Sequence, residues 1–472
     1  METTRNRSAI NGAAGAMEEN TMVILDGFGR TGTLHLHNDW ISFLDAVQFA
    51  SIVPESGNPP TNKMWQAIIR ILREGKSMEL IIGSYQLLIE LEKRFPRVYM
   101  KMLDERESAS SKRADLIVVE EAWSPLDLGG EIGSNEKYAA VSKHNARLDP
   151  AGFATLLENL AEVTIDTEHR SKLLQDMLLF QYLVNVLEGD YLPRYRTFVD
   201  TQEWDLLRES FLNRLLGSRK INYKDLVKLS LSILSTSVAA DSQGSKGRSH
   251  TVSTGDASAT ALLLALPEAK RCTHRAAQNL LVMMMELDSL RKKADMQGLT
   301  TRADVVRTPA LEIILDELMY NKHFLAPFFE VFDEPKLKLE VILKYFGKYS
   351  GKPSVRTRRG IGATDDATIS RFLMSLSNSK ESRTLTKKIG SEVLQLLIAH
   401  VLQACISLPN DELFGVTAAD LDEGAETHAV EEICRNVISA FNSMRELNEG
   451  MEISPLGKQA LFTAATILSA KS

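Results

Sequence analysis

The chain of 472 residues is 44% hydrophobic and 25% charged, which is typical of a folded protein with a large core, and we expect two domains. Its three cysteines, with no C-x-x-C pair among them, exclude a disulfide scaffold and are typical of a reducing compartment. The net charge of −7 hides an asymmetry: residues 1–200 carry 21 Lys and Arg against 29 Asp and Glu, residues 201–400 carry 30 against 22, and residues 401–472 carry 4 against 11. A basic middle between acidic ends indicates a site for a polyanion.

The N-terminus begins with a polar segment, residues 1–20, which has no apolar signal core and is expected to be a mobile arm. Residues 27–32, GFGRTG, then match the G-x-G-x-x-G pattern of dinucleotide-binding folds. In those folds the glycines open a helix whose N-terminal amides bind the pyrophosphate, whereas Thr33–His37 alternates as a strand does. We therefore expect a small β-hairpin near the N-terminus, formed with Met22–Leu25, and no cofactor.

Helical periodicity dominates the rest of the chain and predicts a mainly α fold. A further strand signal is Leu116–Glu120, in the stretch ADLIVVEE. A helix capped by Asn38 is followed by amphipathic segments near 63–75, 77–95, 151–163, 168–188, 203–216, 223–238, 269–297, 308–320, 335–349, 366–377, 384–408, 427–448 and 456–470.

Two polar segments interrupt the helical pattern. Residues 122–149 are rich in Gly, Ser, Asn and Pro and are expected to form a long surface loop. Residues 241–256 are similar in character, and we expect them to be the hinge or exposed loop between an N-terminal helical lobe, residues 21–240, and a C-terminal helical lobe, residues 257–450. Residues 451–472 then form a C-terminal arm.

Motifs that would indicate catalysis are weak. Gly347–Ser354, GKYSGKPS, differs from a Walker A loop because only three residues separate its glycines and a proline follows its second lysine. No HExxH, GxSxG or Cys-His signature is present, and His35 and His37 lack a third metal ligand. The apolar stretch Val393–Leu408 is too short for a membrane span and contains His400. We expect no enzyme, no metal site and no membrane insertion.

Cationic side chains are the strongest signal in the middle of the chain. Lys344 and Lys348 share a helix face by their i, i+4 spacing, and a glycine-flanked segment with three arginines follows them. A flexible arginine loop beside a basic helix suits a phosphate backbone better than base edges. We expect the following cations to converge in one groove: Arg194, Arg196, Arg219, Lys220, Lys270, Arg271, Arg275, Lys344, Lys348, Lys352, Arg356, Arg358 and Arg359.

Three further stretches are informative by their order and character: LDPAGFATLLENL (148–160), LPRYRTFVDTQEWDLLRESFLNRLL (192–216) and APFFEVFDEPKLKLEVILKYFGKYSG (326–351). In these segments the chain resembles the nucleoproteins of non-segmented negative-strand RNA viruses, of the paramyxovirus and bornavirus kind. The resemblance maps the family's RNA-contacting basic pair onto Arg194 and Arg196, and a further RNA contact onto one of the three arginines after Lys352.

The resemblance implies two helical lobes that clamp single-stranded genomic RNA in a basic cleft. It also implies self-assembly through the terminal arms into a homo-oligomeric helical or ring nucleocapsid, the template of the viral polymerase. The implied partners are single-stranded RNA, a viral phosphoprotein and the polymerase. The implied location is the virion nucleocapsid and the host cytoplasm, with the nucleus as an alternative.

Two alternatives stay open. One is a cellular all-helical adaptor or scaffold that binds an acidic partner through the basic central region. The other is a nucleotide-dependent enzyme, which would hold its cofactor near Gly27–Gly32.

Overall fold

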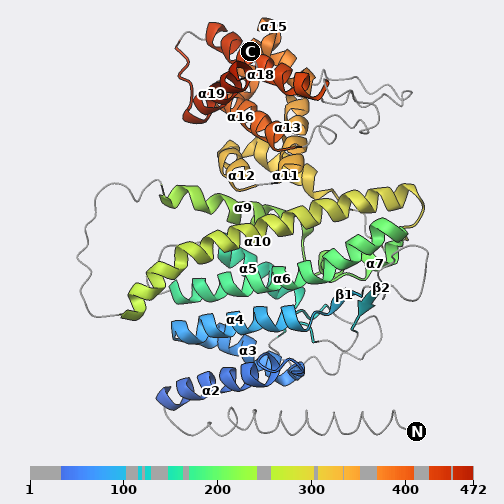
Figure 1. Cartoon of the computed structure of the whole chain (residues 1–472), viewed down its shortest axis with the longest axis vertical. Helices are drawn as coiled ribbons and strands as arrows, with labels where there is room; N and C mark the ends of the chain where they lie inside the picture. Colours follow the sequence, from blue (N-terminus) through green and yellow to red (C-terminus); the bar gives the residue numbers. More distant parts are fainter. Residues whose placement is uncertain are drawn as a thin grey trace. The chain divides into compact units, whose positions relative to one another are not determined.

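The computed structural model describes most of the chain. The described residues are 33–101, 115–119, 123–128, 147–162, 170–241, 257–301, 304, 307–332, 334–350, 369–408, 425–447 and 450–470. The expected N-terminal arm and the GFGRTG turn lie outside them. The described part of the chain is mainly α-helical and contains a two-stranded hairpin (Figure 1), which confirms the predicted fold class.

The chain divides into two compact units, Met1–Ala310 and Leu311–Ser472, which we call unit 1 and unit 2. The predicted lobe boundary at residues 241–256 differs from this division. The helices on its two sides, α9 (Tyr223–Asp241) and α10 (Ala257–Met296), pack against each other within unit 1. The described helices on both sides of that segment therefore lie within one unit.

Unit 1 is a stack of helices that run side by side (Figure 1). Helices α2 and α3 pack on α4, α4 and α5 pack on α6, and α6 and α9 pack on α10. The bounds of its described elements, besides α9 and α10, are α2 (Thr33–Ser51), α3 (Asn62–Glu74), α4 (Met78–Arg94), β1 (Val98–Lys101), β2 (Asp115–Val118), α5 (Pro150–Ala161), α6 (Arg170–Thr201), α7 (Trp204–Arg208) and α8 (Phe211–Leu216).

Side-chain caps explain where several of these helices begin. The hydroxyl of Ser77 accepts a hydrogen bond from the amide of Leu80 at 3.2 Å and opens α4. The carboxylate of Asp149 accepts one from the amide of Gly152 at 2.9 Å and opens α5, with Pro150 at the first helical position. These capping residues stand directly before apolar helical runs, so the sequence already predicts both starts.

The hairpin lies elsewhere than expected. Strands β1 and β2 pair antiparallel with Val98 opposite Val118, so the predicted strand at Leu116–Glu120 is confirmed in part. The other expected strand, Thr33–His37, is wrong, because these residues form the first turns of α2. Alternation over five residues fits the start of a helix as well as a strand, and packing on α4 decides between them.

Two helices are longer than their periodicity predicted, and each continues through a proline, a residue that usually ends a helix. Helix α6 continues past Pro193 to Thr201, and α10 begins ten residues before Pro267. The hydroxyl of Thr197 donates to the carbonyl of Pro193 at 3.0 Å within this stretch of α6. In α6, burial of Tyr191 and Phe198 on either side of Pro193 outweighs the local cost of proline in a helix.

Unit 2 is built around α16, whose apolar residues are almost all buried. Helices α12, α13, α15, α18 and α19 all contact it, and α14 packs on α18. The described elements are α11 (Ala310–Tyr320), the 3₁₀ turn η4 (Lys322–Phe324), α12 (Leu325–Val331), α13 (Pro335–Ser350), α14 (Ile369–Ser377), α15 (Ser379–Ile389), α16 (Ser391–Ser407), α18 (Ala425–Leu447) and α19 (Pro455–Ser469).

Within the described residues no single helix is both long enough and apolar enough to cross a membrane, although α15 and α16, bent by 107° at Gly390, meet both requirements when taken together.

Candidate functional site

Arg194, the first cation expected to touch RNA, is a buried structural residue. Its side chain is 3% exposed. The guanidinium Nε donates to Asp190 Oδ1 at 3.3 Å, and Nη1 donates to the carbonyl of Leu206 at 3.2 Å. Asp190 also accepts the amide of Phe211 at 2.7 Å. Arg194 thus connects α6 to α7 and α8, and it cannot reach a ligand in solvent.

The other cations of unit 1 lie at the surface, and some have acidic partners. Arg196, Arg219 and Arg275 are exposed, and Lys270 is half-buried. Lys220 pairs with Asp149 at 2.9 Å, which raises the pKa of the lysine. Arg271 pairs with Glu268 one turn earlier on α10. Exposed cations with such partners are common on solvated helix faces, where each pair contributes little to stability.

The cations expected in unit 2 follow the same pattern. Lys344 pairs with Glu340 at 2.6 Å, and Lys348 pairs with Asp316. Lys352, Arg356, Arg358 and Arg359 lie outside the described residues. The basic stretch of the sequence is therefore, where it is described, a helix face with acidic neighbours.

An apolar groove lies on unit 1 between α4 and α10. It has a volume of about 660 Å³, and Leu264 beside it is 76% exposed. Its lining residues are Met78, Glu79, Ile82, Gly83, Gln86, Ala261, Leu264 and Ala265. An open groove lined mostly by small and aliphatic side chains, with Glu79 and Gln86 as its polar members, suits the apolar face of a partner helix.

The face of α10 that lines this groove extends along the helix beyond the groove. Leu264, Glu268, Arg271 and Arg275 follow each other at spacings of four, three and four residues, so they share a helix face, and all four are exposed. The groove is thus followed along α10 by a mixed but net cationic stripe.

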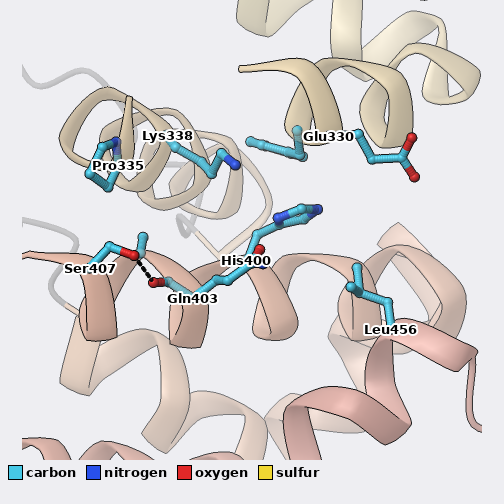
Figure 2. Close-up of a pocket in the computed structure, with 9 residues that line it drawn as sticks. Glu330, Pro335, Lys338, His400, Gln403, Ser407 and Leu456 are labelled. Atoms are coloured by element: carbon cyan, nitrogen blue, oxygen red, sulfur yellow. Dashed lines mark hydrogen bonds between the residues drawn. The ribbon is translucent and has the colours of Figure 1, made fainter. Parts of the chain in front are cut away.

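A second concave site lies within unit 2, where α12, α13, α16 and α19 meet (Figure 2). The pocket has a volume of about 330 Å³. Figure 2 shows Lys338 from α13 and His400 from α16 directed into the same space, with Glu330 extending away from Lys338. The remaining lining residues are Phe329, Pro335, Gln403, Ala404, Ser407 and Leu456.

His400 is the unusual member of this pocket. It is 3% exposed, and neither ring nitrogen makes a hydrogen bond to a described residue. Its ring lies 5.3 Å from that of Phe329. Burial is the main cause that lowers the pKa of His400 to about 4, and the positive charge of Lys338 is the second. The side chain of Gln403 has a smaller effect, which raises this pKa. The imidazole is therefore neutral near pH 7 and presents one donor and one acceptor.

Neither concave site is indicated by a motif in the sequence. Lys338 was one cation among many, and His400 was noted only as a residue unsuited to a membrane span. Within the described residues, no group of three or more His, Cys, Asp and Glu side chains is placed to hold a metal ion.

The fold and its sites define a mainly α-helical protein of two compact units, with an apolar groove on one unit and a polar pocket in the other. The model of the SNI1 middle domain matches residues 97–334, and that of the SNI1 C-terminal domain matches residues 350–472. A relative from Arabidopsis thaliana, "Negative regulator of systemic acquired resistance SNI1", is 41% identical over 466 residues, which cover 98% of this chain and 97% of the relative. The chain belongs to the SNI1 family. No solved structure matches it.

Family membership overturns the viral interpretation. The chain is a relative of a plant cellular regulator and not a viral nucleoprotein, so the expected single-stranded RNA, viral phosphoprotein and polymerase partners and the virion location are wrong. The resemblance depended on segment order and on basic residues, which many helical proteins share. It also assigned RNA contact to Arg194, which the fold buries. The alternative of a cellular helical protein fits the family.

Proposed function

We propose that this protein is a negative regulator of systemic acquired resistance, as the name of its Arabidopsis thaliana relative states for that protein. The observation that carries this proposal is the identity of 41% spread over 98% of one chain and 97% of the other. A match from end to end covers both units, so it extends to the surfaces through which a regulator acts.

We further propose that the protein acts by binding, as a helical scaffold, and not by catalysis. The groove between α4 and α10 is the surface that supports this best, because Leu264 lies beside it at 76% exposure. Burying a leucine side chain in an interface stabilises it by about 1.5–3 kcal/mol. Arg271 and Arg275 continue the same face of α10. The occupant that fits both features is an amphipathic helix with acidic residues beside its apolar face.

Complementation in Arabidopsis thaliana plants that lack the relative tests both proposals. The unchanged chain should restore low resistance in uninfected leaves, measured as pathogen growth after inoculation. Leu264→Asp and Arg271→Glu should fail to restore it, because one places a charge in the groove and the other reverses the stripe. Both side chains are exposed, so both variants should fold, as circular dichroism can confirm.

Matched controls lie in unit 2. Met374→Asp changes another exposed apolar residue of a helix, 64% exposed, and Arg435→Glu changes another exposed arginine that pairs with a glutamate one turn earlier. Both control variants should restore regulation. If the unchanged chain fails, the regulatory function is wrong. If Leu264→Asp restores regulation as well as Met374→Asp does, regulation stands and the groove is not its binding surface.

A further inference from the structure

The pocket of unit 2 contains a polar group that the fold leaves without a partner. His400 is 3% exposed, and both its ring nitrogens lack a hydrogen bond to any described residue. A buried polar atom in this state is destabilising, and native proteins rarely keep one without a ligand or ordered water. The ring points into a pocket of about 330 Å³, a volume within the range of small-molecule sites.

The charges that face this pocket select the kind of ligand. Lys338 is 8% exposed and directs its ammonium group into the space that the His400 ring also faces (Figure 2). His400 is neutral near pH 7, and the exposed Glu330 carries the negative charge of the rim. Among the described lining residues, one ammonium group faces the pocket and one carboxylate, that of Glu330, lies at the rim and extends away from it. This distribution of charge favours a monoanion over a dianion such as phosphate.

The uncharged walls indicate the rest of the ligand. Phe329, Pro335 and Leu456 supply apolar surface, and the Phe329 ring lies 5.3 Å from that of His400. Gln403 and Ser407 add neutral polar groups at one side, although the Ser407 hydroxyl already donates to the carbonyl of Gln403 at 3.0 Å. An apolar body with one negatively charged end matches this distribution.

We propose that the pocket between α13 and α16 binds a small organic monocarboxylate, whose carboxylate lies between Lys338 and His400 and whose apolar body packs on Phe329 and Leu456. The ammonium group of Lys338 supplies a charge-assisted hydrogen bond, and the imidazole of His400 supplies a neutral one. This site lies within unit 2 and is independent of the groove proposed for regulation.

Titration calorimetry of the full chain with benzoate tests the proposal. Benzoate should bind, and benzamide, which has the same shape without the charge, should bind at least about tenfold more weakly. Inorganic phosphate should also bind more weakly than benzoate. Lys338→Met should weaken benzoate binding by about tenfold or more, because it keeps the aliphatic stem and removes the charge. Lys344→Met, on the same helix but exposed and paired with Glu340, should leave benzoate affinity unchanged.

A second measurement does not depend on a variant that disturbs the core. In the unchanged protein with labelled histidine, benzoate should shift the ring resonance of His400 in a saturable way, with the resonance assigned by its loss in His400→Gln. No heat and no shift at millimolar benzoate would overturn the proposal. Equal binding of benzamide, tighter binding of phosphate, or equal losses in Lys338→Met and Lys344→Met would overturn it too. These outcomes do not bear on complementation by the groove variants, so the two proposals fail separately.

Discussion

Buried carboxylates organise unit 1 at the scale of single residues. Asp288, 9% exposed, accepts hydrogen bonds from the Tyr223 hydroxyl at 2.5 Å, the Ala310 amide at 2.7 Å and Arg307 Nε at 3.0 Å. The Arg307 guanidinium lies 4.3 Å from the centre of the Tyr223 ring. Burial and the Asp288 carboxylate raise the pKa of Tyr223 well above its usual range. One acidic side chain therefore joins α9, α10 and Ala310, the last residue of unit 1.

We expect Asp288→Ala to lower the free energy of unfolding by about 3–5 kcal/mol, because it leaves the charge of Arg307 buried without its partner. The matched control is Lys220→Ala, which breaks a pair of similar length between exposed side chains and should change stability little. Urea unfolding followed by circular dichroism measures both. Similar losses in the two variants would contradict a special role for Asp288.

The break between α15 and α16 shows how a single backbone conformation shapes an element of the fold. Gly390 has φ of +102°, and the two helices bend by 107° there. A Cβ atom built on Gly390 would meet nothing within 4 Å. Glycine is therefore favoured at this position by the positive φ angle and not by a lack of space for a side chain. The sequence predicted one continuous segment over 384–408, because periodicity does not report φ.

Two identical substitutions should change stability in opposite directions. Gly390→Ala should destabilise unit 2 by about 1–2 kcal/mol, because a side chain is strained at positive φ. Gly189→Ala should stabilise unit 1 by about 0.5–1 kcal/mol, because Gly189 is exposed within α6 and has equally open surroundings. Thermal unfolding of both variants checks this prediction. A stabilising Gly390→Ala would show that the backbone relaxes freely at the bend.

The division into two units is the main feature at the scale of the whole molecule. Unit 1 has α6 and α10 at its centre, and unit 2 has α16, each with its own buried apolar residues. Asp288 and Gly390 belong to different units and share no hydrogen-bond partner. Changes at the two positions should therefore act independently.

We expect the double variant Asp288→Ala, Gly390→Ala to lose the sum of the two single losses to within about 0.5 kcal/mol. Urea unfolding should place the two losses in separate transitions if the units unfold one after the other, and in one transition if they unfold together. A double loss far from the sum would mean that the two positions are coupled across the unit boundary.

Most of the helices could be predicted from the sequence, because an amphipathic period and a cap are local properties. Segments such as 223–238 and 456–470 match α9 and α19 within a few residues. The predictions are wrong where a local pattern fits both a strand and a helix, as at Thr33–His37. They are also wrong where a helix continues through a proline, as at Pro267. The boundary between the units was not predictable, because a polar loop looks the same within a unit as between units.

The sequence by itself determined that this protein is mainly helical, large enough for two units and basic in its middle. Only the tertiary structure decided which of its polar residues are buried and which share a site. Burial depends on neighbours distant in the chain: it turned Arg194 from an expected ligand contact into a link between helices, and it brought Lys338 and His400 to one pocket. Spacing along a chain fixes neighbours over about one or two helical turns, and longer distances are set by packing.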